Sequence, residues 1–256
     1  MVCARRGSTT RLTAALLVAA LLSACANAQA SGGPPARHSS SVPATPTQPG
    51  PAHATEALLA PTPLFDPSID LRAGPVAVPL ELRLPSLRIT APVLGVGLTP
   101  KNAMDTPMGP PSDPVWHEVF WYRGSGTPGD ATTATIAGHV DDVIGRPAIF
   151  ARLKDLRPGD TVVVHDTRTN LDVDFLVTRS VTYTLKQASD PAVLAQIYGT
   201  GPIRGQGPEP SADGVAHLTL ITCIGNWVRT AGTFDHRLAV YAVALPSATP
   251  HVSSRF

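Results

Sequence analysis

Residues 216–223 have the sequence Ala-His-Leu-Thr-Leu-Ile-Thr-Cys, in which apolar side chains alternate with polar ones before an apolar pair. Alternation with a period of two is typical of a β-strand. The run stops at Cys223, and Ile224-Gly225-Asn226 then indicates a turn. We therefore expect a strand that carries a thiol at its exposed end, where apolar cover is thinner than in mid-strand.

Similar short runs, separated by Gly, Pro and Asp, extend through the rest of the chain from Val76 onward. Seven or eight strands at such spacing favour a closed barrel or a sandwich. Helical spacing predicts two short inserted helices, at 146–156 and 190–198. A Gly- and Pro-rich stretch at 199–214 predicts a mobile loop. The predicted strands cover residues 82–89, 92–98, 133–137, 161–165, 173–184, 215–222 and 238–244.

The composition allows one domain with extensions. Of the 256 residues, 43% are hydrophobic and 15% are charged, enough for one well-filled core. The formal charge is +1, and the first 24 residues hold three arginines and no acid, so the rest of the chain carries 1 − 3 = −2. A nearly neutral chain offers no electrostatic basis for binding nucleic acid.

The first 24 residues predict an export signal, with a basic head before an apolar run at 12–22 that is too short to span a bilayer. The run ends in Leu-Ser-Ala-Cys at residues 22–25, which resembles a bacterial lipobox. Acylation of Cys25 would anchor the chain by lipid to the extracellular face of the cytoplasmic membrane. The alternative is an ordinary cleaved secretory signal.

Beyond this signal we expect three regions. Residues 25–75, rich in Pro, Ala and Ser, predict a disordered tether that holds the domain away from the membrane. Residues 76–246 predict the folded catalytic domain, and residues 247–256 a disordered tail. Cys3 would leave with the signal and Cys25 would carry lipid, so Cys223 is the cysteine of the folded domain. Such a residue is either a small buried hydrophobe or a nucleophile.

Two other residues favour the nucleophile. His139 ends the apolar run Ile136-Ala137-Gly138, and a histidine there can act as base and acid. Arg237 precedes the last predicted strand, which we expect to pair antiparallel with the Cys223 strand, so its guanidinium can hold an oxyanion or a substrate backbone. Taken alone, His139 would be better interpreted as a surface histidine in a loop, and Arg237 as a solvated edge charge.

Together these motifs resemble the sortase family. The order His, Cys, Arg is also that of sortases, and two further motifs are similar to those of actinobacterial class F sortases. The resemblance covers about residues 82–244. The motifs are Thr-Leu-Ile-Thr-Cys at 219–223, Ala-Gly-His-Val-Asp at 137–141, Trp-Tyr-Arg-Gly at 121–124 and Leu-Arg-Pro-Gly-Asp at 156–160.

The resemblance implies an eight-stranded sortase-type β-barrel. It implies Cys223 as the nucleophile, His139 as the proton donor and acceptor, and Arg237 as the oxyanion or substrate-positioning group, with Arg229 in reserve. Thr222 would contact the region beside the thiol. The implied activity is cleavage of a Leu-Pro-x-Thr-Gly-like sorting signal of a surface protein after Thr, through a thioester, with transfer to an amine acceptor, either a cell-wall precursor or a pilin lysine.

No cofactor is expected, and the sequence lacks the paired spacing of a zinc site and the acidic clusters of a calcium site. An L,D-transpeptidase is a weaker alternative, because its cysteine lies in a Ser-x-Gly-Cys setting whereas Cys223 follows Ile-Thr. The non-enzyme alternative is a catalytically silent lipoprotein that binds wall peptides. The presence of all three residues, His139, Cys223 and Arg237, favours the enzyme.

Overall fold

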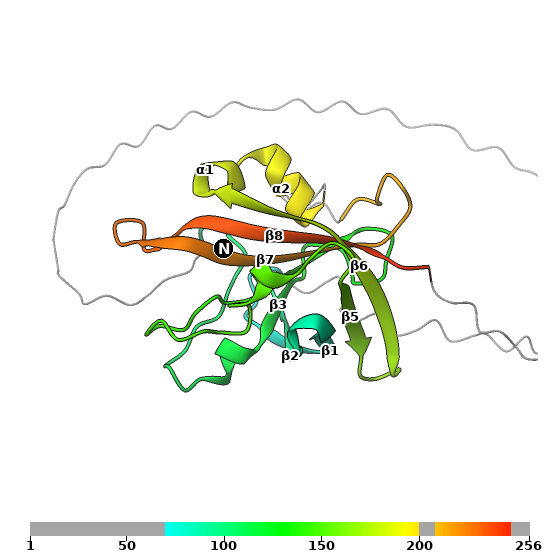
Figure 1. Ribbon diagram of the computed structural model, residues 1–256, viewed down its shortest axis with the longest axis horizontal. Helices are drawn as coiled ribbons and strands as arrows, with labels where there is room; N and C mark the ends of the chain where they lie inside the picture. Colours follow the sequence, from blue (N-terminus) through cyan, green and yellow to red (C-terminus); the bar gives the residue numbers. More distant parts are fainter. Residues whose placement is uncertain (1–69, 200–207, 247–256) are drawn as a thin grey trace, which may run out of the picture. The chain divides into compact units, whose positions relative to one another are not determined.

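Eight strands close into a barrel in the order β1-β2-β3-β4-β7-β8-β6-β5, and β5 pairs with β1 to complete it. The computed structural model describes residues 70–199 and 208–246 (Figure 1). The prediction of a mainly β, eight-stranded barrel is confirmed. The strands are β1 (Val76–Leu84), β2 (Ile89–Val96), β3 (Val119–Tyr122), β4 (Thr133–Ala137), β5 (Thr161–Asp166), β6 (Leu171–Thr184), β7 (His217–Val228) and β8 (Thr233–Ala244).

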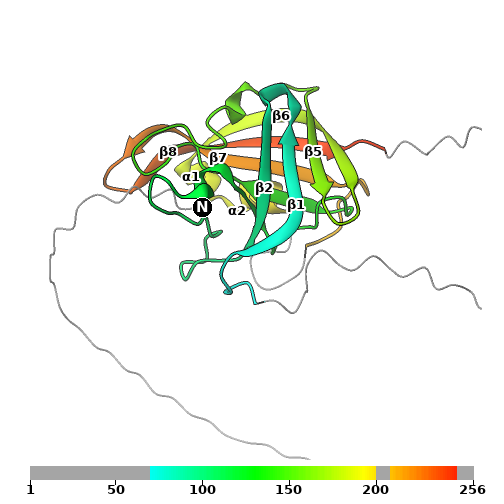
Figure 2. The ribbon, with the colours of Figure 1, turned by 90° about the horizontal axis from the view of Figure 1, so that it is seen from below.

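Two strand pairs in this barrel are parallel, β2 with β3 and β4 with β7, and the others are antiparallel. A parallel pair needs a long crossover between its strands. The crossover from β4 to β7 contains β5, β6 and both α-helices, so residues distant in sequence become neighbours at β4 and β7. Figure 2 shows β1 and β2 side by side, with β5 closing the barrel beyond β1.

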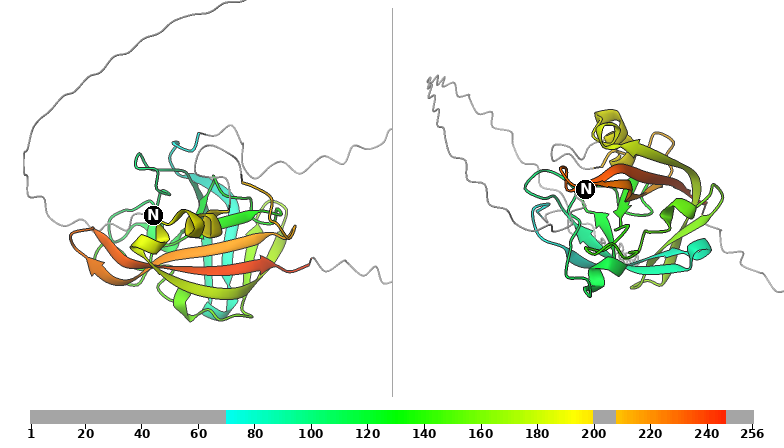
Figure 3. Two further views of the ribbon diagram at one scale, coloured as in Figure 1. Left: turned by 90° about the horizontal axis from the view of Figure 1, so that it is seen from above. Right: turned by 60° about the vertical axis from the view of Figure 1, so that its left-hand side comes forward.

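Two short α-helices follow β6, α1 (Leu185–Ala188) and α2 (Pro191–Tyr198). Thr184 and Gln187 form a capping box at the start of α1, and Asp190 caps α2 by accepting a hydrogen bond from the backbone N–H of Ala192. Helix α1 contacts β6 and β8, and α2 contacts β4. Both helices therefore lie on the outer surface of the barrel (Figure 3), and the predicted helix at 190–198 is confirmed.

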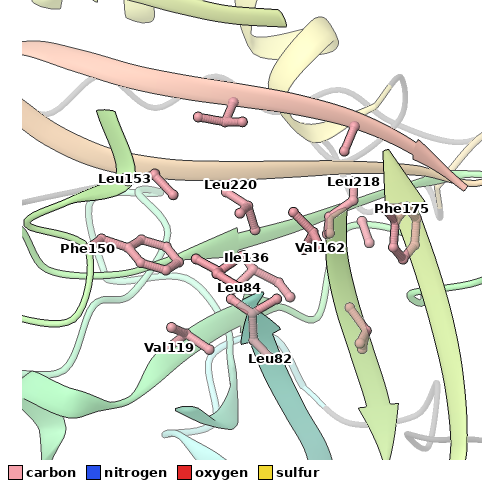
Figure 4. Packing of buried hydrophobic residues seen from close by; sticks show 14 of the residues in the cluster. Leu82, Leu84, Val119, Ile136, Phe150, Leu153, Val162, Phe175, Leu218 and Leu220 are labelled. Atoms are coloured by element: carbon pink, nitrogen blue, oxygen red, sulfur yellow. The ribbon is translucent and has the colours of Figure 1, made fainter. Parts of the chain in front are cut away.

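Alternation along the strands divides the apolar residues between two clusters. Leu218 and Leu220 of β7 point into the barrel and belong to its main core, shown in Figure 4, together with Phe150 and Leu153. Ile221 of β7 points outward, into a second buried cluster on the outside of the barrel. Successive side chains of a strand face opposite sides, so the odd-numbered residues of β7 up to Cys223 face the outside of the barrel.

The structure corrects the predicted strand at 82–89, which is divided between β1 and β2 by a 3₁₀ turn, η1 (Pro85–Leu87). Pro85 begins this turn, and Arg88 ends it in the left-handed region with φ of 55°. The proline removes a donor and fixes its own φ, which favours a turn over a continuous strand.

The predicted helix at 146–156 is also wrong. The segment folds as turns and a single 3₁₀ turn, η3 (Leu153–Asp155), because its backbone bonds elsewhere: Phe150 N–H donates to the His139 carbonyl at 2.9 Å, and Ala148 N–H donates to the Val140 carbonyl at 3.1 Å. Its apolar residues still reach the core. Helical spacing alone therefore did not distinguish a helix from a chain of turns.

Strand β3 and helix α1 were not predicted. The apolar run Val119–Tyr122 is too short to show a period, while Thr-Leu-Lys-Gln at 184–187 is a capping-box signal that the sequence does carry. The predicted signal peptide, Cys25, the tether up to residue 69, the tail, and residues 200–207 of the predicted loop lie outside the described residues. Within the described ranges, no helix is long and apolar enough to cross a membrane.

Candidate active site

Cys223 lies in the middle of β7, not at its end as the sequence suggested, and its side chain is buried. The strand continues through the expected turn to Val228, because β8 pairs with it on both sides of the cysteine. The β7–β8 ladder keeps its register up to Ile224 and then shifts before Trp227. Because Cys223 lies two residues after Ile221, its side chain also faces the outside of the barrel.

Arg237 of β8 is the register partner of Cys223, which confirms that the two strands are antiparallel neighbours. Directly opposed residues on antiparallel strands have Cβ atoms about 4.5–5.5 Å apart and face the same side of the sheet. Arg237 is buried, whereas Arg229 is exposed in the turn between β7 and β8. Of the two arginines considered from the sequence, Arg237 is therefore the one beside the thiol.

His139 lies at the same position along the strand direction as Cys223, on the side of β7 opposite Arg237. Ala137, the last residue of β4, pairs in parallel with Ile221 of β7, and His139 and Cys223 each lie two residues further on. Val140, which follows His139, packs against the small cluster formed by Cys223 and Phe234. The barrel thus brings His139, Cys223 and Arg237 to one level on three adjacent strands or strand extensions, in the order β4, β7, β8.

Hydrogen bonds fix the junction between β4 and β7 just before His139. The Gly138 N–H donates to the Ile221 carbonyl at 3.1 Å, and the Thr222 hydroxyl donates to the Gly138 carbonyl at 2.9 Å. Thr222 therefore acts on the histidine side of the site by holding the backbone that carries His139. A glycine is needed at 138, because an added Cβ would lie 2.5 Å from the ring of Phe150.

The His139 imidazole is buried between aromatic rings. Its ring centroid lies 4.8 Å from that of Trp116 and 5.3 Å from that of Phe120. Its Nε2 lies 2.8 Å from the Pro107 carbonyl oxygen, which can only accept, so Nε2 carries a proton and donates it. Nδ1 is then the nitrogen left to take up and release a proton during a reaction.

Burial lowers the pKa of His139 below its usual value of 6.5, and this effect outweighs the Pro107 carbonyl and Asp141, which both raise the pKa. The loop that carries Pro107 is itself held in place. Trp116 Nε1–H donates to the Pro110 carbonyl at 2.8 Å, and Arg146 donates to the Pro111 carbonyl. The imidazole is therefore held in one orientation and kept largely neutral by its surroundings.

The Arg237 guanidinium is anchored to the backbone of its own hairpin. Nη1 donates to the carbonyls of Phe234 at 2.9 Å and His236 at 2.8 Å, and Nη2 donates to the Thr233 hydroxyl at 2.8 Å. Burial lowers the pKa of Arg237, and Tyr198 raises it. Because the ordinary value is 12.5, the group stays cationic. These bonds fix a positive charge beside Cys223.

A pocket of about 460 Å³ adjoins the site. It is mostly apolar, and Ile221 and Arg237 form its end nearest the thiol. Burial raises the pKa of Tyr198 in its wall to about 12, so this phenol is neutral at ordinary pH. The pocket is lined by Leu98, Asn102, Ala103, Met104, Tyr122, Leu185, Ala188, Ser189, Leu194, Tyr198, Ile221 and Arg237.

The sequence alone did not reveal the groups that orient His139. Trp116 and the Pro107 carbonyl come from a segment without regular periodicity, and a backbone carbonyl leaves no sequence signal. Among the described residues, no group of three His, Cys, Asp or Glu side chains could hold a metal ion. In its reduced form, Cys223 lies between an imidazole and a guanidinium, next to an apolar pocket, and is suited to attack on the carbonyl of a bound peptide.

Residues 82–245 match the family model described as Sortase domain. The chain is similar to sortase A from Corynebacterium diphtheriae, with 17% identity, coverage of 70% of this chain and 65% of that chain, and a TM-score of 0.46. It is also similar to sortase C-1 from Actinomyces oris, with 19% identity, coverage of 65% and 73%, and a TM-score of 0.41. No curated protein is similar enough to count as a match.

Proposed function

Because this chain belongs to the sortase family, whose members are cysteine transpeptidases, we propose that it cleaves a Leu-Pro-x-Thr-Gly-like sorting signal after Thr and transfers the new carbonyl end to an amine. The observation that carries the proposal is the register of the barrel, which places Cys223 between Arg237 of β8 and the level of His139 after β4. Residues of these three types at one level suit acyl transfer through a thioester.

The first half-reaction uses all three side chains. When the thiol proton resides on His139 Nδ1, the Cys223 thiolate attacks the Thr carbonyl and forms a carbon–sulfur bond. Arg237 stabilises the negative charge that develops on the carbonyl oxygen. The Thr–Gly carbon–nitrogen bond then breaks, the proton on His139 moves to the departing Gly amine, and a thioester remains.

The second half-reaction reverses these roles. An acceptor amine attacks the thioester carbonyl, and neutral His139 takes the proton that the amine loses. A carbon–nitrogen bond forms, the carbon–sulfur bond breaks, and Cys223 leaves as the thiolate. The acceptor is a primary amine of a cell-wall precursor or of a pilin lysine. The proton balance needs no other group or cofactor.

The pocket supports a peptide whose residues before Thr are apolar. Its wall of leucines, Met104 and the tyrosines can bury a Leu and a Pro side chain, while Arg237 marks the end at which the scissile carbonyl would lie. The volume of about 460 Å³ is in the range of sites that hold small ligands. The pocket thus fits the signal that the sequence motifs suggest.

We propose further that the enzyme works on the extracellular face of the cytoplasmic membrane. The lipobox-like Leu-Ser-Ala-Cys at 22–25 supports lipidation at Cys25, and the Pro-rich residues that follow support a tether. Incorporation of a labelled fatty acid into the wild-type chain in cells, and its loss in Cys25→Ser, tests this anchor. Labelling that persists in the variant excludes Cys25 as the lipidated residue.

To test the activity, the full chain, kept reduced, is incubated with a quenched Leu-Pro-x-Thr-Gly peptide and an amine acceptor. The expected products by mass spectrometry are a thioester adduct on Cys223 and a ligated peptide, both lost in Cys223→Ala. A control is Arg168→Ala, an exposed arginine paired with Asp166, which should keep both products. If no product forms across a panel of sorting peptides while the peptides still bind, the chain is a binding module.

A further inference from the structure

One wall of the pocket is a short hairpin, residues 97–105, hereafter the pocket hairpin. It turns through Thr99 and Asn102, whose N–H donates to the Thr99 carbonyl at 2.9 Å, and it is closed by an isolated bridge between Leu98 and Met104. Four of the twelve residues that line the pocket come from it, namely Leu98, Asn102, Ala103 and Met104. Its position therefore sets the width of the pocket.

The first described residues of the chain, 70–74, hold this hairpin from outside and are hereafter the strap. The Leu98 N–H donates to the Leu71 carbonyl at 2.7 Å. The Arg72 guanidinium donates to the Thr99 carbonyl and to the Asn102 side-chain oxygen. The strap thus bonds to the first arm and to the turn of the pocket hairpin.

The strap is in turn fixed to the barrel by Arg123, which follows β3. Its Nη2 donates to the carbonyls of Ala73 at 2.8 Å and Gly74 at 3.3 Å. The side chain is only 2% exposed, and burial lowers its pKa. The strap therefore lies between an arginine of the barrel and the pocket hairpin.

Arg123 is a costly residue for this position. Among the described residues its Nε and Nη1 atoms are buried with no hydrogen-bond partner, and buried guanidinium donors without partners are destabilising. An apolar side chain of similar length would avoid that cost. What Arg123 provides is the hold on the strap, which indicates that the position of the strap matters for more than stability.

We propose that the strap positions the pocket hairpin for peptide binding, so that Arg72 and Arg123 act as positioning residues that set the affinity for the sorting signal. The proposal rests on the function proposed above. Neither arginine is among the residues that line the pocket. Their effect is therefore expected on peptide binding and not on the thiol chemistry.

The test measures kcat and KM of the full chain for the sorting peptide in Arg72→Ala, Arg72→Lys and Arg123→Met. Loss of the Arg72 bonds is expected to raise KM by about five-fold, the effect of roughly one hydrogen bond, with kcat unchanged. In Arg72→Lys the ammonium group can reach one of the two acceptors, so its KM should lie between those of the wild type and Arg72→Ala. Arg168→Ala is the matched control, an exposed arginine whose partner is Asp166, and it should leave KM unchanged.

Arg123→Met separates positioning from folding, because it removes two buried donors without a partner and should leave thermal stability equal or higher while KM rises. A KM within two-fold of the wild type in both Arg72→Ala and Arg123→Met overturns the proposal. So does a fall in kcat that follows a loss of thermal stability. If the wild type turns over no peptide, the proposed function fails. The strap is then tested by hydrogen exchange at the Leu98 amide, which Arg72→Ala should speed up. Unchanged exchange would overturn the proposal that the strap holds the pocket hairpin.

Discussion

Replacing Trp116 with phenylalanine tests whether the indole orients the catalytic imidazole. The Trp116 indole lies with its ring centroid 4.8 Å from that of His139, and its Nε1 donates to the Pro110 carbonyl at 2.8 Å. Phenylalanine retains an aromatic ring and removes the donor. Three residues before Pro110, the Pro107 carbonyl accepts from His139 Nε2, so loosening this segment loosens the imidazole.

The magnitude follows from the bonds involved. A hydrogen bond between neutral groups contributes about 0.5–1.5 kcal/mol, and weakening the bonds at Pro110 and Pro107 together is expected to cost roughly 1.4 kcal/mol in the transition state. That corresponds to a fall of about ten-fold in kcat/KM. The pKa of His139 should also fall, because the Pro107 carbonyl raises it and the phenyl ring retains the apolar cover.

Trp121→Phe is the matched control. Trp121 is also buried, and its Nε1 donates to a backbone carbonyl, that of Gly126, at 3.0 Å, but its ring belongs to the main core of the barrel. Both variants should lose similar unfolding free energy in urea titrations. Only Trp116→Phe should lower kcat/KM and shift the acidic limb of the pH–rate profile to lower pH. Equal losses of activity in the two variants, without a pH shift, would refute the positioning role.

Three further predictions concern the site. Arg237→Lys should lower kcat of peptide cleavage by about 10²-fold, the scale of one oxyanion donor. Arg229→Ala should leave kcat unchanged. The opposite result would assign the oxyanion role to Arg229. Because the pKa of His139 is lowered in the folded state, the unfolding free energy should fall as pH drops below about 6.5. Urea titrations of His139→Gln should show a smaller fall. An equal dependence on pH in the variant would contradict the lowered pKa of His139. Gly138→Ala should cost about 1–3 kcal/mol in the same titration, since its Cβ would meet Phe150, and an unchanged midpoint would contradict the close packing.

The strands could be predicted where one face is buried and the other is polar or less buried. The alternation at 215–222 predicted β7, and the long run at 173–184 predicted β6, because period-two patterning reflects the two faces of a sheet. The closure of the barrel came from the family resemblance, not from the pattern, which left a sandwich equally open. The pairing of β7 with β8 was the part of the topology that sequence adjacency made predictable.

Two of the failures share one physical cause, which is bonding to distant parts of the chain. The segment 146–156 has helical spacing, yet its backbone bonds to His139 and Val140, and no local pattern carries that information. The same holds for Cys223, whose strand continues because β8 supplies partners beyond the expected turn. In the site, residue types pointed to His139, Cys223 and Arg237, whereas Trp116 and Arg72 act through backbone carbonyls that have no sequence signature.

The change of register between Ile224 and Trp227 separates two parts of the last hairpin with different freedom to vary. Asp235 braces this irregularity by accepting from the Asn226 N–H at 2.8 Å. On the Cys223 side of the irregularity, one inserted or deleted residue would turn Cys223 away from Arg237. On the side of the hairpin tip, the bulge can absorb a change in the length of the chain. The tip between the strands is therefore a place where a foreign loop can be grafted, so that new peptide or acceptor preferences could be engineered while the thiol keeps its neighbours.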